Sequence, residues 1–463
     1  MARRTKRQEQ RIYWRGRGVG GSTAINGQIA IRGVLDAFDQ WAEQGCEGWS
    51  AAHVLQGFNR LETDLDFADQ PHHGRAGPIP VYRTPQQDWG PVDQALRDAA
   101  LALGYPWTDD LNAPDAEGVT TYAINSRDGK RVSSNDGYLE PARSRPNLEI
   151  KGGMLADRVL IDQGKATGIA AIGPEGPVQF DLAPGGELLL AAGAIHSPPI
   201  LMRSGIGPAA HLIGHGIDIV RDLPVGDGMF DHPFVRLELK LKDQLKPKGV
   251  NDRHTNCCVK YSSNLPGGTF SDMIFFAMNH GGVGVAQDMA QFGEAGIHCA
   301  LFEAHSRGSV RLASPDPRHQ PVVDLNMLDD ERDLARLRDG ARRLMAIGQH
   351  DAVTGRCREV SLGNTGRPIS DLADAPDSEL DEWVLTDCSD AQHGAGSCRM
   401  GAFDFDDGKS VVDPDCRVRG IAGLRVIDAS IMPADCKANT NFTTIMIAEM
   451  MAERLMRAER SSA

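Results

Sequence analysis

A glycine-rich turn is the first stretch whose residue types and spacing could serve chemistry. Residues 16–21 (GRGVGG) satisfy the G-x-G-x-x-G pattern, and Asp39 lies near the offset expected of a ribose-binding acid. Such glycines let the backbone approach a dinucleotide diphosphate, provided that a buried strand precedes the turn and a helix follows it. Only two or three apolar residues, set between arginines, precede this turn. A nicotinamide-dependent dehydrogenase is therefore an open alternative that this context weakens.

Histidines and cysteines do not predict a metal site. His72-His73 and the i, i+4 pair His211/His215 are metal-like arrangements, but neither has a carboxylate or a thiol at ligand spacing in the sequence. The nine cysteines are scattered and form no C-x-x-C motif. We therefore predict no bound metal, reduced thiols and a cytoplasmic location.

Bulk composition excludes several partners. The formal net charge is -14, so no broad basic surface is expected for nucleic acid. No apolar run approaches the roughly 20 residues that span a bilayer, and no apolar segment follows the basic residues 1–7, so we expect neither a membrane span nor a secretory signal. The 41% hydrophobic content of the 463 residues suits a globular protein, for which we expect two lobes.

The pattern of elements changes twice along the chain. A continuous apolar run at 187–193 ends in glycine, which is typical of a buried parallel strand just before a cofactor. In contrast, residues 235–241 alternate strictly between apolar and polar side chains, as in a half-buried antiparallel strand. Further helices are expected at 50–62, 88–103, 330–348 and 443–457. Two strands joined by a turn at 162–165 are expected within 148–172, and further strands at 273–278, 297–302 and 424–429. We therefore predict an α/β domain interrupted by an α+β insertion on an antiparallel sheet.

Several longer stretches resemble the glucose–methanol–choline (GMC) oxidoreductase family. Residues 16–27 (GRGVGGSTAING) are similar to the family's loop beside the flavin, and residues 193–207 (GAIHSPPILMRSGIG) are similar to a second diagnostic segment in the family's order. Similarity extends over nearly the whole chain, including residues 129–134 (GKRVSS), 145–148 (RPNL), 223–226 (LPVG), 231–233 (DHP) and 306–310 (SRGSV).

The resemblance implies an FAD-binding, Rossmann-like domain made of residues 1–230 and 391–463, with a substrate-binding domain at 231–390. It also implies which positions contact the cofactor. These are Gly20, Gly21, Ser22, Asn26 and Gly27 in the first loop, and Ala156, Ala192, Asp428, Ala429, Phe442 and Thr443 farther along the chain.

Two further segments resemble the catalytic segments of the family. Residues 392–401 (QHGAGSCRMG) place His393 on the catalytic histidine, and residues 439–446 (NTNFTTIM) place Asn441 on the second catalytic residue. Alcohol oxidation needs loss of the hydroxyl proton, which imidazole can accept, and transfer of a hydride to flavin N5. An amide can stabilise the developing alkoxide. Alone, His393 would be a loop histidine and Asn441 a helix cap.

The sequence departs from the family pattern at two points. Ile25 stands where some members attach FAD through a histidine, so we predict noncovalent FAD. Family members begin with a strand, a G-x-G-x-x-G turn and a helix, a unit of roughly 30 residues, whereas Gly20 lies nineteen residues from Met1. We therefore expect this first βαβ unit, and its support for the diphosphate, to be missing.

The leading hypothesis is thus a choline dehydrogenase-like flavoprotein that oxidises a small-molecule alcohol. A second hypothesis is a non-catalytic or degenerate GMC-like subunit that needs a complementing chain or forms a homo-oligomer. The nicotinamide-dependent dehydrogenase is the third. The substrate pocket is expected in the insertion, so the sequence does not identify the alcohol.

Overall fold

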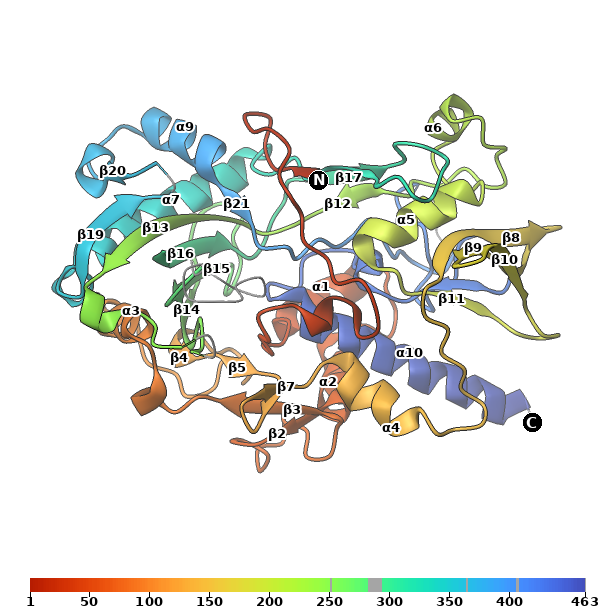
Figure 1. The fold of residues 1–463 in the computed structure, drawn as a ribbon, viewed down its shortest axis with the longest axis horizontal. Helices are drawn as coiled ribbons and strands as arrows, with labels where there is room; N and C mark the ends of the chain where they lie inside the picture. Colours follow the sequence, from red (N-terminus) through yellow and green to blue (C-terminus); the bar gives the residue numbers. More distant parts are fainter. Residues whose placement is uncertain (250–251, 282–293, 364, 405–407, 463) are drawn as a thin grey trace.

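The computed structural model describes residues 1–249, 252–281, 294–363, 365–404 and 408–462. A large sheet lies on one side of the molecule, and a smaller set of strands and helices lies on the other (Figure 1). The chain passes between these sides more than once, as the predicted discontinuous organisation requires.

The large sheet is antiparallel and has eight described strands. Its order is β20-β19-β13-β16-β15-β14-β4, with β21 also paired to β13. The central strand β13 (Pro233–Leu241) alternates between buried and half-buried side chains over most of its length, because one face packs on the core. The other strands are β4 (Gly118–Thr121), β14 (Cys257–Tyr261), β15 (Met273–Met278), β16 (Ala295–Leu301), β19 (Cys357–Leu362), β20 (Arg367–Pro368) and β21 (Ser389–Asp390).

Helices cover this sheet. Helix α7 (Glu331–Gln349) packs on β13 and β16, while α3 (Pro91–Ala102) packs on β14 and β15. Both lie where periodic apolar residues predicted them. The short α8 (Asp351–Thr354) contacts α3, and α9 (Asp377–Asp387) contacts α7.

The second side carries the parallel strands. β11 (Leu188–Leu190) pairs in parallel with β22 (Leu424–Val426), and the two make a sheet of two described strands. Helix α5 (Gly193–Arg203) follows β11 directly, and α10 (Thr440–Ser462) packs against α2 (Ala51–Leu61). This combination confirms the predicted α/β fold with an antiparallel insertion.

A three-stranded antiparallel sheet stands beside this pair. It has the order β10-β9-β8, with β8 at Leu155–Asp162, β9 at Lys165–Gly173 and β10 at Gly176–Asp181. The predicted turn between β8 and β9 is confirmed: Gln163 and Gly164 have φ angles of 47° and 77°, in the left-handed region that tight turns use.

Three strand pairings cross the predicted domain boundaries. Strand β4 joins the large sheet from within residues 1–230, β1 (Ala2–Arg3) pairs in parallel with β18 (Val322–Asp324), and the strand at residues 227–229 pairs with the strand at residues 308–311. The proposed boundaries at 230 and 391 stay a prediction. The remaining elements are α1 (Leu35–Glu43), α4 (Glu140–Ala142), α6 (Ala209–Gly214), β2 (Glu62–Asp64), β3 (Ile79–Arg83), β5 (Ala123–Ile124), β6 (Ser126–Arg127), β7 (Lys130–Arg131), β12 (Asp227–Met229) and β17 (Gly308–Arg311).

The G-x-G-x-x-G turn at 16–21 lacks the surroundings of a nicotinamide site. Ile12 and Trp14 before it are 55% and 50% exposed, so no buried strand precedes the turn. A 3-10 helix, Gly21–Ala24, follows it instead of an α-helix. The nine cysteines all lie in the described ranges, and they are buried and form no disulfide bond. Within the described ranges, no helix has the length and apolar character needed to cross a membrane.

Candidate active site

His393 is held by an antiparallel ladder that continues from the large sheet. Pro233 pairs with Asp390 and Phe230 pairs with Ala395. Between these pairs the amide of Ala391 donates to the carbonyl of His232 at 3.0 Å. Gln392 has a φ of 61°, a turn in the chain just before the histidine. This register brings His232 and His393 side by side although 161 residues separate them.

The two ring nitrogens of His393 have different neighbours. Nδ1 lies 2.9 Å from Nδ1 of His232, and Nε2 lies 2.9 Å from the side-chain nitrogen of Asn439. Phe302 packs edge-on, with ring centroids 5.8 Å apart. Because an amide nitrogen donates, Nε2 of His393 carries the lone pair. This nitrogen can therefore act as a base.

His232 links His393 to a buried carboxylate. Nε2 of His232 lies 2.9 and 2.8 Å from the two carboxylate oxygens of Asp435. His232 is fully buried and Asp435 is 5% exposed. The carboxylate also accepts the backbone amides of Lys437 at 2.9 Å and Ala304 at 3.2 Å. Asp435, His232 and His393 thus form one continuous hydrogen-bonded chain.

The surroundings fix the charges of these groups. Burial, followed by the neighbouring His232 and Arg15, holds the pKa of His393 well below its usual range, so its ring is neutral at pH 7. Burial alone would raise the pKa of Asp435, but His232 and the two backbone amides outweigh burial and lower it. A neutral base and an ionised carboxylate therefore stand at the two ends of the chain.

A second carboxylate clamps the backbone of both histidines. Asp231 accepts the amides of His232 at 2.7 Å and His393 at 2.8 Å, and the Tyr13 hydroxyl donates to its other oxygen. Arg15 donates to the Tyr13 hydroxyl at 2.7 Å. Burial, followed by the charge of Asp390, raises the pKa of Asp231. The segment containing Tyr13 is thus tied to the histidine pair.

Asn441 lies at the same helix end as Asn439. Helix α10 begins at Thr440, between the two asparagines. Among the described residues, no hydrogen bond joins Asn441 to His393, because Asn439 takes that place. The Asn441 amide nitrogen and the Asn439 carbonyl oxygen are buried without a hydrogen-bond partner in the described part of the chain. Buried polar atoms are normally satisfied, so both fit a site that holds a further group.

Three predicted cofactor residues meet where the parallel strands end. The amides of Ala192 and Gly193 donate to Ser197 Oγ and Asp428 respectively, at 3.1 and 2.8 Å. Ser197 Oγ donates to the same oxygen of Asp428 at 2.5 Å, and Ala429 follows on the chain. This edge of a parallel sheet is where ligands bind in α/β folds. A Cβ at Gly193, whose φ is +81°, would meet nothing within 4 Å, so there is room beside this backbone.

The first glycine loop is held mainly by its own backbone. Gly20 and Gly21 have φ angles of 85° and 51°, and a Cβ at Gly21 would meet open space. Asn26 accepts from Arg131 at 2.7 Å. Ser22 is exposed, and Gly27 is half-buried. These features fit a backbone that a flavin could approach.

The other predicted cofactor positions differ in accessibility. Ala156 lies on β8 opposite Ala171 and is partly buried. Phe442 and Thr443 are fully buried, backbone and side chain alike. The role of each predicted site residue stays a prediction.

No role was predicted from the sequence for five residues of this constellation: Tyr13, Asp231, His232, Asp435 and Asn439. His232 and Asn439 lie inside stretches that carry the family resemblance, yet no role was assigned to them. The missing signal was the strand register, which places His232 opposite the 391–395 segment.

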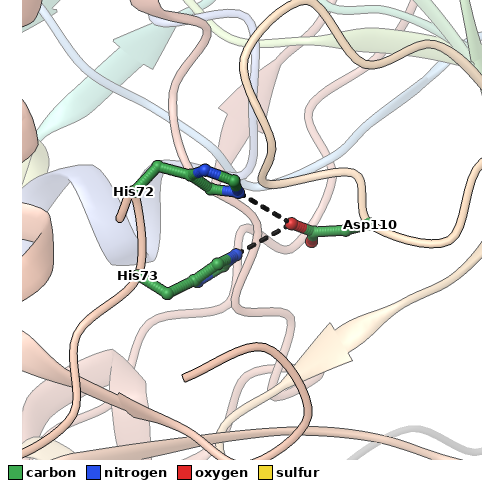
Figure 2. A group of neighbouring side chains, drawn as sticks. All are labelled: His72, His73 and Asp110. Atoms are coloured by element: carbon green, nitrogen blue, oxygen red, sulfur yellow. Dashed lines mark hydrogen bonds and ion pairs between the residues drawn. The ribbon is translucent and has the colours of Figure 1, made fainter. Parts of the chain in front are cut away.

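The expectation about metal-like histidines rested on a wrong premise. Asp110, which is distant in sequence, lies 2.8 Å from Nε2 of His73 and 3.5 Å from Nε2 of His72 (Figure 2). Sequence spacing could not show this carboxylate, because the fold brings it in. Ligand atoms of these three residues lie within 4.8 Å of one another. Buried cations also neutralise this cluster: Arg83 donates to Asp110 at 2.6 Å.

Known proteins match this chain over nearly its full length. A GMC oxidoreductase family model for the N-terminal part matches residues 3–234, and the model for the C-terminal part matches residues 304–448. The chain is 35% identical over 470 residues to an oxygen-dependent choline dehydrogenase of Pseudomonas aeruginosa, covering 95% of this chain and 80% of that protein. An oxygen-dependent choline dehydrogenase of Klebsiella pneumoniae is also 35% identical, with 95% and 81% covered.

Solved structures share the fold. Pyridoxine 4-oxidase from Mesorbium loti superposes with a TM-score of 0.83 at 26% identity, covering 96% of this chain and 84% of that one. Formate oxidase from Aspergillus oryzae gives a TM-score of 0.85 at 22% identity, covering 100% and 88%.

Proposed function

The chain belongs to the GMC oxidoreductase family, and from this we propose that it oxidises an alcohol with His393 as the base that accepts the hydroxyl proton. It is an FAD-dependent oxidoreductase acting on CH–OH donors. The chemistry that FAD supplies when bound is acceptance of the hydride from the alcohol carbon.

The state of Nε2 of His393 carries this proposal. The nitrogen accepts from Asn439 at 2.9 Å, and the pKa of the ring is lowered by burial and by its neighbours, so an unprotonated imidazole is available at neutral pH. An alcohol hydroxyl would take the place of the Asn439 amide and pass its proton to Nε2.

Anaerobic flavin bleaching tests the activity directly. The FAD-loaded protein is mixed with choline, pyridoxine or benzyl alcohol, chosen because relatives act on choline and pyridoxine by name. We expect at least one to reduce the flavin, and the fastest becomes the test alcohol for the variants below. Protein that holds FAD stoichiometrically and is bleached by none of the three would contradict the proposal for these substrate classes.

The glycine loop and the sheet edge are proposed to hold FAD without a covalent bond. Gly20 and Gly21 offer close backbone approach, and Ala192 and Ala429 lie at the strand ends. Ile25 is 41% exposed, and its aliphatic side chain has no atom that can form a flavin bond.

We therefore expect acid precipitation to release all flavin. Trichloroacetic acid should leave a colourless pellet and a yellow supernatant whose absorbance accounts for the bound FAD, because only noncovalent contacts are lost on unfolding. Flavin that stays with the washed pellet would contradict the role assigned to Ile25.

The two asparagines at the start of α10 are proposed to act differently. Asn441, with its free buried amide nitrogen, supplies the donor for the developing alkoxide, whereas Asn439 orients Nε2 of His393. We expect Asn441→Ala to lower the maximal rate of flavin reduction by about 10²–10³-fold. The matched control Asn439→Ala should lower it by less than about 10-fold. Stopped-flow reduction by the test alcohol measures both, and the reverse order would assign the alkoxide donor to Asn439.

One observation favours the alternative of a subunit that needs a partner. β11 has a neighbour only on its β22 side in the described chain, and Leu189 on β11 is 47% exposed. An uncovered apolar strand edge is a place for another chain. We propose on this ground that another chain packs against the open side of β11. Folded protein that takes up no FAD in a flavin titration would favour this alternative.

The nine cysteines are buried and form no disulfide bond, which supports the proposal that the protein works in a reducing compartment such as the cytoplasm.

A further inference from the structure

We infer that Asp435 and His232 are positioning residues that fix the tautomer of His393 and take over the proton it accepts. The inference rests on the proposed function, because it needs His393 to be the base. It concerns two residues to which neither the sequence nor the family comparison gives a role.

With the amide nitrogen of Asn439 facing His393 and with His232 neutral, the hydrogen-bond chain has one assignment of its protons. Asp435 can only accept, so Nε2 of His232 must carry a hydrogen. A neutral His232 then has its lone pair on Nδ1, and Nδ1 of His393 must donate to it across 2.9 Å. This leaves the lone pair of His393 on Nε2, facing the amide of Asn439. The Asp435 carboxylate thus determines, through His232, that Nε2 of His393 is the base.

The same hydrogen-bond chain can take up the alcohol proton at His393 and pass a different proton on to His232. The alcohol O–H bond breaks and its proton binds Nε2 of His393, while the Nδ1 proton of His393 passes to Nδ1 of His232. The positive charge then rests on His232, which now has hydrogens on both nitrogens and lies beside ionised Asp435. The alcohol keeps its electron pair until the hydride leaves for FAD, so one proton and one hydride are accounted for.

Burial makes this transfer favourable. A charge on His393 is opposed by burial and by Arg15, whereas a charge on His232 is paired with a carboxylate at 2.8 Å. Opposite charges attract strongly where water is excluded. The arrangement parallels the general logic of a base oriented by a buried carboxylate, with a second imidazole inserted.

Other charged groups facing the pair do not replace this role. Asp231 accepts the two backbone amides and the Tyr13 hydroxyl, so it does not reach either ring. Asp390 is paired with Arg4 at 2.5 Å. Arg307, whose charge acts on Asp435, donates to the carbonyls of Ala304 and Ser306. Arg15 and these groups contribute to the local electrostatic potential, while among the described side chains Asp435 is the hydrogen-bond partner of Nε2 of His232.

Two variants separate the tautomer from the proton transfer. Asp435→Asn keeps the size of the side chain but can donate to His232, which would reverse both tautomers and put a hydrogen on Nε2 of His393. His232→Asn offers an amide oxygen that can accept from Nδ1 of His393 but cannot be protonated. Phe302→Leu is the matched control, because Phe302 packs against both rings, with centroids 4.5 and 5.8 Å away, and holds no proton.

The test is the pH dependence of flavin reduction by the test alcohol, measured on FAD-loaded variants. Asp435→Asn should lower the plateau rate by about 10²–10⁴-fold. His232→Asn should lower it by about 10–100-fold. His232→Asn should also shift the acid limb by at least about one pH unit to lower pH. The sign follows because the base works when unprotonated. In the wild type a proton taken up by the pair can rest on His232 beside Asp435, whereas in His232→Asn it must rest on His393, where burial and Arg15 oppose the charge. Phe302→Leu should leave the acid limb in place.

The outcomes distinguish proton transfer through His232 and Asp435 from an effect of packing. If Asp435→Asn and His232→Asn, here called the relay variants, both keep the plateau rate and the acid limb of the wild type, the inference is overturned. A uniform rate loss in all three variants, with no movement of the acid limb, would also overturn it, since packing alone would explain that result. Activity that survives in His393→Ala would instead defeat the proposed function. If one relay variant does not take up FAD, the other variant still tests the inference, because a separate change in flavin reduction is expected for each.

Discussion

Replacing His393 with alanine is expected to lower the rate of flavin reduction by the test alcohol by about 10²–10⁴-fold, the usual loss for a general base. The reason is that Nε2 is the proposed acceptor of the hydroxyl proton, and the described contacts of this nitrogen offer only the Asn439 amide in its place. An amide that donates cannot accept a proton from the alcohol.

Stopped-flow reduction under anaerobic conditions measures this effect most cleanly. The rate at saturating alcohol should fall, while the alcohol concentration needed for half-saturation changes little, because the base acts in the transition state. Added imidazole should restore part of the rate by occupying the space left by the ring. His53→Ala removes an exposed histidine from α2 and should reduce flavin like the wild type. Equal rates in His393→Ala and His53→Ala would remove His393 from the mechanism.

Local patterns predicted the framework around this site well. The alternation in β13 and the left-handed turn between β8 and β9 are visible in short stretches of sequence, and both elements are confirmed. The apolar run that contains β11 also predicted this strand. Such features depend on neighbours a few residues apart, which a single sequence contains.

The partners of His393 depend on distances that a sequence does not contain. His232 and Asp435 lie 161 and 42 positions away from His393, and only the register of β13 with β21 and the loop before α10 bring them together. Strand β4 shows the same limit. Its four residues are all buried, so they lack the alternation that would have predicted an edge of the large sheet.

The cluster around His73 was overlooked for the same reason. Nδ1 of His73 lies 2.8 Å from Glu62 and 3.1 Å from Asp64, while Nε2 lies 2.8 Å from Asp110. Arg32 pairs with Glu62, and Arg83 pairs with Asp64 and Asp110. Three buried carboxylates thus face two arginines and one histidine. The charges balance only when His73 is protonated.

Replacing His73 with alanine is therefore expected to destabilise the fold by about 3–5 kcal/mol at pH 7, the usual cost of removing one partner from a buried ionic network. Burial lowers the pKa of His73, but its hydrogen bonds to Asp110, Asp64 and Glu62 outweigh burial and raise the pKa to about 10. The ring is hence charged at pH 7, and its loss leaves three carboxylates with two cations. The matched control is His72→Ala, because His72 touches Asp110 only at 3.5 Å and its pKa is lowered by burial. We expect a loss below about 1 kcal/mol there.

The pH dependence of the stability difference between the wild type and His73→Ala shows whether the charge of His73 causes that difference. A group whose pKa is raised by folding stabilises the folded state fully below its unfolded pKa of about 6.5. That stabilisation disappears as the pH rises through about 10. The contribution of Asp110 to stability has the opposite pH dependence. Burial raises the pKa of Asp110, but His73 and Arg83 outweigh burial and lower the pKa to about 2. This contribution is therefore lost as the pH falls from about 4 to about 2. The gap in thermal unfolding midpoint between wild type and His73→Ala should therefore be widest between about pH 4 and 6.5 and narrow toward pH 10. A gap that stays constant from pH 6 to 10 would mean that His73 acts by packing, not by its charge.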